Sequence, residues 1–488
     1  MISKHTQTKS YLTTKLPLLT SFTIIAIFIS GCLVGPNYQP PELSVPDVWH
    51  QRIAEKIIAD GSVDHKWWEG FNDTILTSLI EKASIGNLDA KQAALRIQQA
   101  RTVVDITSGR YYPDVDAVGA YRRAKISGNG LSGSASGGSP SLTNSHSAGF
   151  DSSWEIDIFG KINRSVESAI ASQQASIENY HDVLVSLYAE IALNYADLRA
   201  TQKRLLFARA NIKTQQDTLK LTKSLYDAEL VPGLDIEQAK LNLANTEAFV
   251  PDLLILENAI LNRLAVLTGQ YPGSLREELE ALGEIPSYNN TVKVGLPVDL
   301  VRQRPDIRRI ERQLAAQTAE VGIATAELYP SLSLSGTFAF ESTKSDNLFE
   351  RPSRAYGFGP SMRWSLFAGN RIRGNMKLQE LITDEVYVQY EQTVLLAVEE
   401  VENTTVEYVQ KIKRTDFLTK SVAASEKSTV LVGDLYRNGL TDFQNVLDMQ
   451  RTLSQQQDNL AQSEGDIAKS IVRIYKALGG GWETEPNE

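Results

Sequence analysis

Two stretches of the chain alternate strictly between apolar and polar positions. In residues 331–340 Leu332, Leu334 and Phe338 alternate with serine and threonine, and residues 355–366 repeat the pattern with aromatic side chains on the apolar side. A weaker alternation surrounds Phe150. Strands of about ten residues with one apolar and one small or polar face are typical of membrane barrels. A half-buried soluble hairpin gives the same period, so the alternation alone leaves both structures open.

Two much longer stretches indicate helices. No proline occurs from Lys161 to Val231 or from Ser361 to Glu485, and a helix of ~60 residues is about 90 Å long. In the last stretch apolar residues recur every seven positions, with Gln457 and Glu464 between them: Leu453, Leu460, Ile467 and Ile474. This half-polar seam favours helices packed side by side in a wall over a simple two-stranded coiled coil.

Each long helical stretch contains one turn. The segments "LYDAELVPGLDIEQAK" (225–240) and "LYRNGLTDFQNVLDMQ" (435–450) carry the turn signals Pro232-Gly233 and Asn438-Gly439. A return helix follows each turn. We therefore expect two helical hairpins.

These elements occur twice along the chain, as an internal repeat. "GRYYPDVD" reappears as "AELYPSLS", which pairs Tyr112 with Tyr329 at an offset of 217, and Trp154 pairs with Trp364 at an offset of 210. The seven-residue difference falls on the Gly/Ser-rich run 127–140, which we interpret as a surface loop. The sequence thus predicts a first repeat at residues 73–271 with a β-hairpin at about 114–158, and a second repeat at 292–481 with a β-hairpin at about 331–366. Residues 272–291 form the linker and residues 482–488 the tail.

The N-terminus has the layout of a secretory signal. Three lysines precede an apolar stretch from Leu16 to Ile29, which is too short and wrongly flanked to be a spanning helix. The next residues complete Ile29-Ser30-Gly31-Cys32, which matches the lipoprotein signal. We expect residues 1–31 to be removed and Cys32, the only cysteine, to carry a covalent lipid anchor. By resemblance to enterobacterial-type lipoproteins, Leu33 after the cysteine favours the outer membrane, and residues 32–72 form the lipid-anchored segment.

Composition excludes several other functions. The formal charge of −10 becomes more negative when the three signal-peptide lysines are lost, and an acidic chain is a poor nucleic-acid ligand. The five histidines are scattered, and no metal site, nucleophile elbow or phosphate loop is apparent. We therefore expect no enzyme and no cofactor. After the signal no apolar run is long enough for a spanning helix, so a membrane crossing must use strands.

The strands require more than one copy of the chain. Two hairpins supply four strands, and four strands cannot close a barrel, while lipid does not tolerate an open edge. Two copies would give about eight strands and a filled lumen, and three would give about twelve and an open pore. Sequence physics alone leaves the two oligomers open, although a transport role favours the larger.

Long motifs resemble one known family over nearly the whole mature chain. "HKWWEGFNDTILTSLIEKASIGNLDAKQAALRIQQAR", "GLPVDLVRQRPDIRRIERQLAAQTAEVGIATAELYPSLSLSG" and "YKALGGGWE" resemble the TolC-type outer-membrane efflux lipoproteins of the NodT-like branch. The resemblance implies an α+β membrane protein: a homotrimer with a 12-stranded outer-membrane β-barrel, a 12-helix periplasmic α-barrel and an equatorial α/β belt. It also implies a periplasmic adaptor and an inner-membrane pump, usually of the resistance-nodulation-division type, with passive conduction through this exit duct.

The resemblance also assigns roles at the hairpin tips. The tips should contact the adaptor through these candidate residues: Leu230, Gly233, Leu234, Gly439, Leu440, Asp442 and Phe443. Turn geometry alone would equally explain the two glycines. The family tends to carry a leucine four residues before a constricting aspartate; here the aspartate is Asp448 and the leucine position is Gln444. A ring of Asp448 carboxylates would favour cations, whereas Gln444 argues against an apolar plug. An ordinary solvated carboxylate is the competing interpretation of Asp448.

Two other functions remain open at this point. A type I secretion duct for polypeptides would share these features, because the pump rather than the duct chooses the cargo. A lipid-anchored periplasmic adaptor would instead have one helical hairpin between the halves of soluble β domains, not two tandem copies.

Overall fold

The computed structural model describes residues 33–42, 45–46, 48–50, 57–58, 64–126, 141–288 and 292–482. The expected signal peptide, Cys32 and the Gly/Ser-rich run 127–140 lie outside these residues. The chain divides into two compact units, each assembled from both halves of the sequence. One unit, here called the sheet unit, contains residues 99–173 and 312–387 with the segment before Pro41. The helical unit contains residues 41–98, 174–311 and the chain from Val388 onward.

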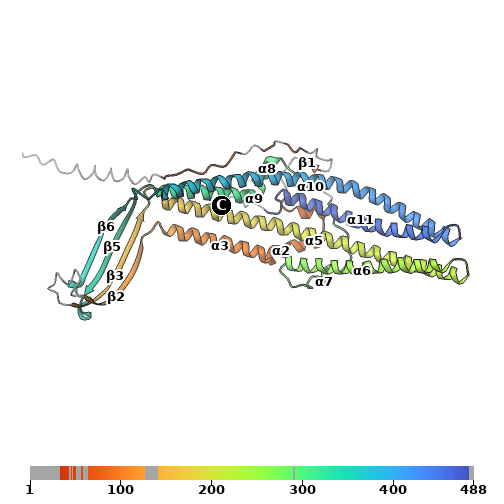
Figure 1. The fold of residues 1–488 in the computed structure, drawn as a ribbon, viewed down its shortest axis with the longest axis horizontal. Helices are drawn as coiled ribbons and strands as arrows, with labels where there is room; N and C mark the ends of the chain where they lie inside the picture. Colours follow the sequence, from red (N-terminus) through yellow and green to blue (C-terminus); the bar gives the residue numbers. More distant parts are fainter. Residues whose placement is uncertain are drawn as a thin grey trace, which may run out of the picture. The chain divides into compact units, whose positions relative to one another are not determined.

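The sheet unit contains one antiparallel sheet of four strands in the order β2-β3-β5-β6 (Figure 1). The strands are β2 (Asp114–Ile126), β3 (Ser141–Ile156), β5 (Ser331–Ser342) and β6 (Arg354–Arg363). The central pair β3–β5 joins the two halves of the duplicated sequence. Trp364 and Leu366, which the alternation assigned to the last strand, lie beyond its end at Arg363. The short 3-10 helices η2 (Ser345–Asn347) and η3 (Arg351–Ser353) connect β5 to β6.

The register confirms the predicted alternation in both copies. Ala117, Phe150, Phe338 and Tyr356 are opposite one another across all four strands, so they share one face of the sheet. The other face carries small and polar side chains, because neighbours along a strand point to opposite faces. Phe150 and Phe338 are 55% and 44% exposed. Strands β2 and β6 each have one neighbour among the described residues, so the sheet has two open edges.

Four long helices form two hairpins of the same size. Helix α5 (Lys161–Asp227) and helix α10 (Arg371–Arg437) each have 67 residues, and their return helices α6 (Gly233–Leu267) and α11 (Phe443–Ala477) each have 35. The presence of two such hairpins argues against the single-hairpin adaptor. None of the helices in the described part of the chain combines the length and the apolarity needed to cross a membrane.

Shorter elements complete the fold. In chain order they are β1 (Ile57–Ile58), η1 (Trp67–Phe71), α2 (Thr74–Gly86), α3 (Leu88–Gly109), α7 (Arg276–Leu279), β4 (Val292–Lys293), α8 (Pro297–Gln303) and α9 (Pro305–Ala326). Helix α2 begins where it does because the Asp73 side chain accepts hydrogen bonds from the backbone N–H groups of Ile75 and Leu76 at 2.9 and 3.0 Å. Strands β1 and β4 pair in parallel.

The main core lies in the helical unit. Trp67 is 1% exposed and stacks on Tyr475 of α11 with ring centroids 5.6 Å apart. Trp68 meets Tyr188 of α5 edge to face at 5.2 Å. The "WWEGF" motif therefore contributes its large aromatic side chains to the core between the long helices, where each buries a large apolar area.

The two copies use different side chains to cap equivalent helix ends. In the first copy, the Asn87 amide donates to the carbonyl of Leu267 at 2.9 Å, near the end of α6. At the equivalent place in the second copy, Arg304 Nη1 donates to the carbonyl of Ala477 at 2.5 Å. Both donors stand just before a helix and hold the end of a distant one.

In the second copy the capping residue also belongs to an ion network. Arg304 also binds both carboxylate oxygens of Asp306, at 3.0 and 2.8 Å, and Glu400 Oε2 at 2.8 Å. Burial alone would raise the pKa of Asp306, but the hydrogen bond and the charge of Arg304 hold this pKa below its ordinary value. The "RPD" motif is therefore a partly buried junction that joins α9, α10 and the end of α11.

We expect Arg304→Gln to lower the free energy of unfolding of the helical unit by about 2–3 kcal/mol, because two carboxylates lose a charged hydrogen-bond donor. Thermal unfolding followed by circular dichroism of the helices would measure this loss. Arg373→Gln removes an exposed cation from α10 and should change the stability by less than about 0.5 kcal/mol. Equal effects of the two substitutions would refute the assigned role of Arg304.

Candidate functional site at the helical tips

Both helical hairpins end in the same hydrogen-bonded turn. In the first tip, the N–H of Leu230 donates to Leu225 O at 2.9 Å and that of Glu229 to Tyr226 O at 2.8 Å. In the second tip, Leu440 and Gly439 donate to Leu435 and Tyr436 at 2.9 and 3.0 Å. This pair of bonds is the Schellman motif, which satisfies free carbonyls at a helix end.

The motif requires a left-handed backbone at one residue. Gly439 fills this position in the second tip with φ +69°, and Glu229 fills it in the first tip with φ +59°. A residue with a Cβ is strained there. Turn geometry therefore explains Gly439. It does not explain Gly233, which is the first residue of α6 and does not have a positive φ.

The two tips of one chain pack against each other. All four long helices contribute to one apolar cluster, whose buried members are Ala239, Val432, Tyr436, Phe443, Val446 and Leu447. Phe443 is 3% exposed, so we assign its ring to the packing of the tips and not to their contact surface. The leucines Leu230, Leu234 and Leu440 are 71%, 64% and 72% exposed. The tips thus present apolar side chains to the outside, and Asp442, the residue before α11, is also exposed.

Gln444 and Asp448 share the exposed face of α11. They stand four residues apart, and the Gln444 amide donates to Asp448 Oδ1 at 2.9 Å. The opposite face of the same turns is buried through Val446, Leu447 and Gln450. Asp448 therefore points away from the packing within its own chain.

A buried polar contact next to the tips was not predicted from the sequence. The hydroxyl of Tyr436 on α10 donates to Asp235 Oδ2 on α6 at 3.2 Å, and both side chains are buried. Burial raises the pKa of Asp235. Burial, together with the charge of Asp235, raises the pKa of Tyr436 to about 12. The partners are 201 residues apart, so no local motif could have revealed them.

Buried amides continue the polar contact along the helices. Asn242 of α6 donates to Gln450 Oε1 of α11 at 3.2 Å, and Gln450 donates to Thr218 of α5 at 2.8 Å. Farther from the tips, Asn211 of α5 donates to Gln457 Oε1 at 3.0 Å. The half-polar seam expected from the heptad positions is thus confirmed.

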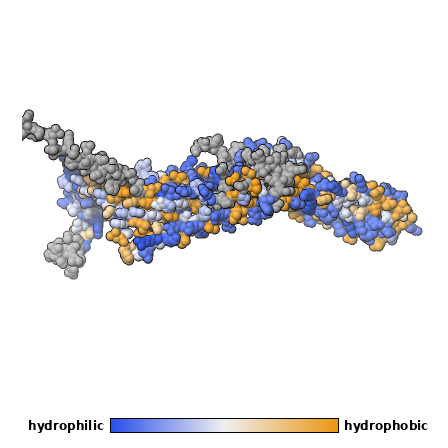
Figure 2. Space-filling model, turned by 90° about the horizontal axis from the view of Figure 1, so that it is seen from above, coloured by the Kyte–Doolittle hydropathy of each residue, from blue (hydrophilic) through white to orange (hydrophobic). Residues whose placement is uncertain are grey.

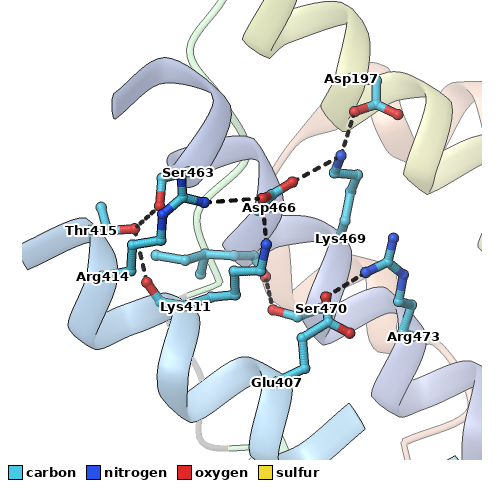
Figure 3. A network of polar contacts seen from close by, with 11 residues as sticks. Asp197, Glu407, Lys411, Arg414, Thr415, Ser463, Asp466, Lys469, Ser470 and Arg473 are labelled. Carbon is cyan, nitrogen blue, oxygen red and sulfur yellow. Dashed lines mark hydrogen bonds and ion pairs between the residues drawn. The ribbon is translucent and has the colours of Figure 1, made fainter. Parts of the chain in front are cut away.

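Nearer the main core, ion pairs replace these amides (Figure 3). Asp466 of α11 lies 2.6 Å from Lys411 Nζ of α10 and 3.0 Å from Lys469 Nζ, which also reaches Asp197 of α5 at 2.7 Å. Burial alone would raise the pKa of Asp466, but hydrogen bonds from Lys411 and Lys469 lower it. The same view shows Arg473 bound to Glu407 at 2.6 Å. These pairs hold three helices in one relative position.

Apolar side chains also reach the surface of the long helices, among polar ones (Figure 2). Examples on α6 and α10 are at least 54% exposed: Leu241, Ile255, Leu395, Leu396 and Phe417. Such repeated apolar exposure is typical of a surface that meets another protein or copy. Among the described residues, no group of three or more His, Cys, Asp or Glu side chains could hold a metal ion.

Comparison with known proteins identifies this architecture. The model of the outer membrane efflux protein family matches residues 79–270 and 296–480. The chain belongs to the outer membrane efflux protein family. Nodulation protein T of Rhizobium leguminosarum bv. trifolii is 31% identical over 462 residues, which cover 94% of this chain and 96% of that protein. The toluene efflux pump outer membrane protein TtgF of Pseudomonas putida is 28% identical over 475 residues, covering 94% and 96%.

Solved structures agree with this family. The outer-membrane channel OprN has a TM-score of 0.86 with 34% identity, and the match covers 92% of this chain and all of that one. The open state of the MtrE outer membrane channel of Neisseria gonorrhoeae has a TM-score of 0.80 with 25% identity, covering 92% and 98%. This outer membrane efflux protein therefore has the fold of the TolC-like channels, and its place is the outer membrane of a Gram-negative bacterium.

We expect Gly439→Ala to lower the free energy of local unfolding of the second tip of this efflux protein by about 1 kcal/mol, because alanine is strained in the left-handed region. Glu229→Gly should raise the free energy of local unfolding of the first tip by up to about 1 kcal/mol, because glycine relieves the same strain. Amide hydrogen exchange in the two turns measures both changes, at about five-fold in rate for each kcal/mol.

Gly433→Ala is the matched control, because Gly433 lies within α10 with open space around its Cβ position and no positive φ. That substitution should slow exchange locally, since alanine favours a helix. Slower exchange in Gly439→Ala as well would contradict the Schellman assignment.

Proposed function

We propose that this protein is the exit duct of a tripartite efflux system and passively conducts substrates that an inner-membrane pump delivers. The observation that carries the proposal is the four-stranded sheet with one aromatic face and two open edges. Three copies would supply about twelve strands and close a barrel with an open pore. The duct has no catalytic step and needs no cofactor, because the pump supplies the energy.

The helical hairpins supply the periplasmic part of the duct in this proposal. Three chains would contribute twelve helices to an α-barrel. Exposed leucines along α6 and α10 support contacts between copies, since such surfaces are costly to leave in water. The exposed Leu230 and Leu440 at the tips would meet a periplasmic adaptor, and the pump would be of the resistance-nodulation-division type.

Asp448 is the proposed constriction of the duct. Its carboxylate stands on the exposed face of α11, and a ring of such groups favours cations in a pore. Gln444, four residues before it, gives the constriction a polar and not an apolar neighbour. The Gln444–Asp448 hydrogen bond holds this carboxylate against its own helix.

Planar lipid bilayers test the duct directly. The purified full-length protein should form cation-preferring channels, and Asp448→Ala should raise the single-channel conductance because a bulky, mutually repelling ring is removed. Asp448→Asn keeps the size of the side chain and its contact with Gln444. It should therefore abolish the cation preference without changing the conductance. Unchanged conductance and selectivity in both variants would remove Asp448 from the gate, whereas silent bilayers with wild-type protein would refute the duct.

Cys32 is the proposed site of the covalent lipid anchor. We expect fatty-acid label to be incorporated into the wild-type chain in cells and to be absent from Cys32→Ser, because this thiol is the only one in the chain. Gel electrophoresis of the purified protein after metabolic labelling measures the incorporation. Continued labelling of Cys32→Ser would refute lipidation at this residue.

A further inference from the structure

The charged residues of the four strands β2, β3, β5 and β6 are divided between the two faces of the sheet. The register places every carboxylate of these strands on the face opposite Phe150: Asp114, Asp116, Asp151, Glu155 and Glu341. On the face of Phe150, here called the aromatic face, the residues with a permanent charge are all cations: Arg123, Lys125 and Arg354. We call these three the edge cations, because β2 and β6 are the edge strands. This division indicates that the two faces meet different surroundings.

The edge cations stand at one end of the sheet. Strand β2 follows helix α3 and strand β3 leads into helix α5, so the other end of the sheet is the one at which β2 stops and β6 begins. Arg123 and Lys125 are near the last residue of β2, and Arg354 is the first residue of β6. The opposite end of the aromatic face carries no charge within the strands.

Aromatic rings border the edge cations on the same face. The rings of Tyr121 and His146 are 4.8 Å apart, and the guanidinium of Arg354 lies 5.9 Å from the ring centroid of Phe340. In a membrane barrel such aromatic residues mark the interface between hydrocarbon and headgroups. A cation on the lipid face is costly at the middle of the bilayer and nearly free at the interface. In a barrel wall the edge cations would therefore lie at the level of the headgroups.

The edge cations have no carboxylate of their own. Their side chains are exposed, and none of them forms an ion pair with another residue in the part of the chain that the structure describes. Strand pairing between copies cannot bring a strand carboxylate to them, because those carboxylates are on the other face. Like charges close together destabilise a sheet, so a group of edge cations requires an anion from outside the strands.

The internal repeat predicts how the edge strands of two copies would pair. The β3–β5 pair joins the two halves of one chain, and its repeat equivalent is β6 of one copy with β2 of the next. In the β3–β5 pair His146 is opposite Ser342. The repeat offsets of 210 and 217 convert this pair into Tyr356 of one copy opposite Lys125 of the next. Arg354 is then the diagonal neighbour of that lysine, about 7–8 Å away. The seam between two copies would thus collect edge cations from both.

We propose that each seam between copies binds the phosphate groups of an anionic glycolipid through the edge cations. This inference rests on the proposed duct, in which the aromatic face meets lipid and the helices are periplasmic. The edge cations then reach the outer leaflet, which in a Gram-negative bacterium is rich in phosphorylated glycolipid. Arginine binds phosphate through two parallel hydrogen bonds, and lysine adds a compact charge. The lipid supplies the missing anion and holds neighbouring copies together.

Native mass spectrometry of the full-length oligomer in detergent, with bisphosphorylated lipid A as the probe, tests the site. We expect the wild type to retain this lipid and Lys125→Gln/Arg354→Gln to bind it roughly ten-fold more weakly or less, because two cations near the anionic headgroup are lost. Arg354→Lys keeps the charge but not the planar fork, so its affinity should lie between the two.

The matched control is Arg122→Gln/Arg363→Gln, which removes one cation from each of the same two strands on the opposite face. It should bind lipid A as the wild type does, and size-exclusion chromatography establishes that both double variants keep their assembly. Equal losses of affinity in the two double variants would overturn the proposal, as would absence of binding by the wild type.

A second comparison separates the lipid from free phosphate. Lipid A treated with a phosphatase should bind to the wild type roughly ten-fold more weakly, because the charged acceptors of the headgroup are gone. Inorganic phosphate at the concentration of the lipid should not displace it. Unchanged binding of the treated lipid would assign the affinity to the acyl chains, and displacement by inorganic phosphate would identify a general anion site. Either result would overturn the proposal.

Cysteine cross-linking tests the seam. Lys125→Cys with Tyr356→Cys should form a disulfide on oxidation, because opposite residues in antiparallel strands have Cα atoms about 4.5–5.5 Å apart. Strands β3 and β5 separate these two positions within one chain, so the disulfide must join copies, and non-reducing gel electrophoresis detects it. Lys125→Cys with Phe358→Cys puts the two positions on a diagonal and should link poorly. Efficient linking of this second pair alone would overturn the shared site.

Bilayer recordings on the same preparations distinguish this inference from the duct itself. Channels without lipid A binding by the wild type would leave the duct standing and remove the lipid site. Silent bilayers together with no cross-linked oligomer would remove the duct and the site with it, because the site exists only between copies.

Discussion

The open edges of the sheet are the constraint on which the rest of the molecule depends. Strands β2 and β6 each leave one side of their backbone without a partner strand among the described residues. In hydrocarbon each unsatisfied N–H or C=O group costs several kcal/mol, while the aromatic face through Phe150 and Phe338 favours the same hydrocarbon. A single chain cannot meet both conditions. In the proposed duct, further copies would meet them together, and they would also cover the exposed leucines along α6 and α10. Under that proposal, oligomerisation would be part of the folding problem of this chain and not a later addition.

The two copies of the repeat share some contacts and differ in others. Backbone geometry is kept: both tips use the same pair of hydrogen bonds, and the indoles of Trp154 and Trp364 each donate at 3.0 Å to the carbonyl of an equivalent residue, Tyr111 and Leu328. Charge chemistry has diverged. Asn87 caps a distant helix end as a neutral amide, whereas Arg304 does so with two carboxylates. The neutral hydrogen bond of Asn87 involves no charge that must be desolvated. In the second copy, loss of one partner would leave a charge without its counter-ion, which destabilises the fold more.

Periodicity and turn chemistry were enough to predict the strands, the long helices and the hairpin tips, because these are local properties. The register confirmed the two sheet faces, although β6 ends at Arg363 and leaves Trp364 outside the strand. The Asp235–Tyr436 contact joins the two halves of the sequence, and Arg304 meets Glu400 and Ala477 96 and 173 positions away, so no local pattern could predict either contact. Phe443 looked like a surface residue of the turn, yet the packing of four helices buries it. Solvent exposure at a tip depends on neighbours that no local pattern contains.

The half-polar seam has a physical consequence for motion of the tips. Near the main core, Asp466 and its lysines join helices through ion pairs that are partly buried, so separating them would leave charges poorly solvated. Closer to the tips, neutral amides join α11 to α6 through Asn242 and Gln450 and to α5 through Gln457. An amide that loses one partner can bond to water at a small net cost, because protein and water hydrogen bonds nearly balance. A seam of leucines would instead expose apolar area when opened. The change from ion pairs to amides thus gives the hairpins their firmest polar contacts near the core, whereas the tips themselves are packed by the apolar cluster around Phe443.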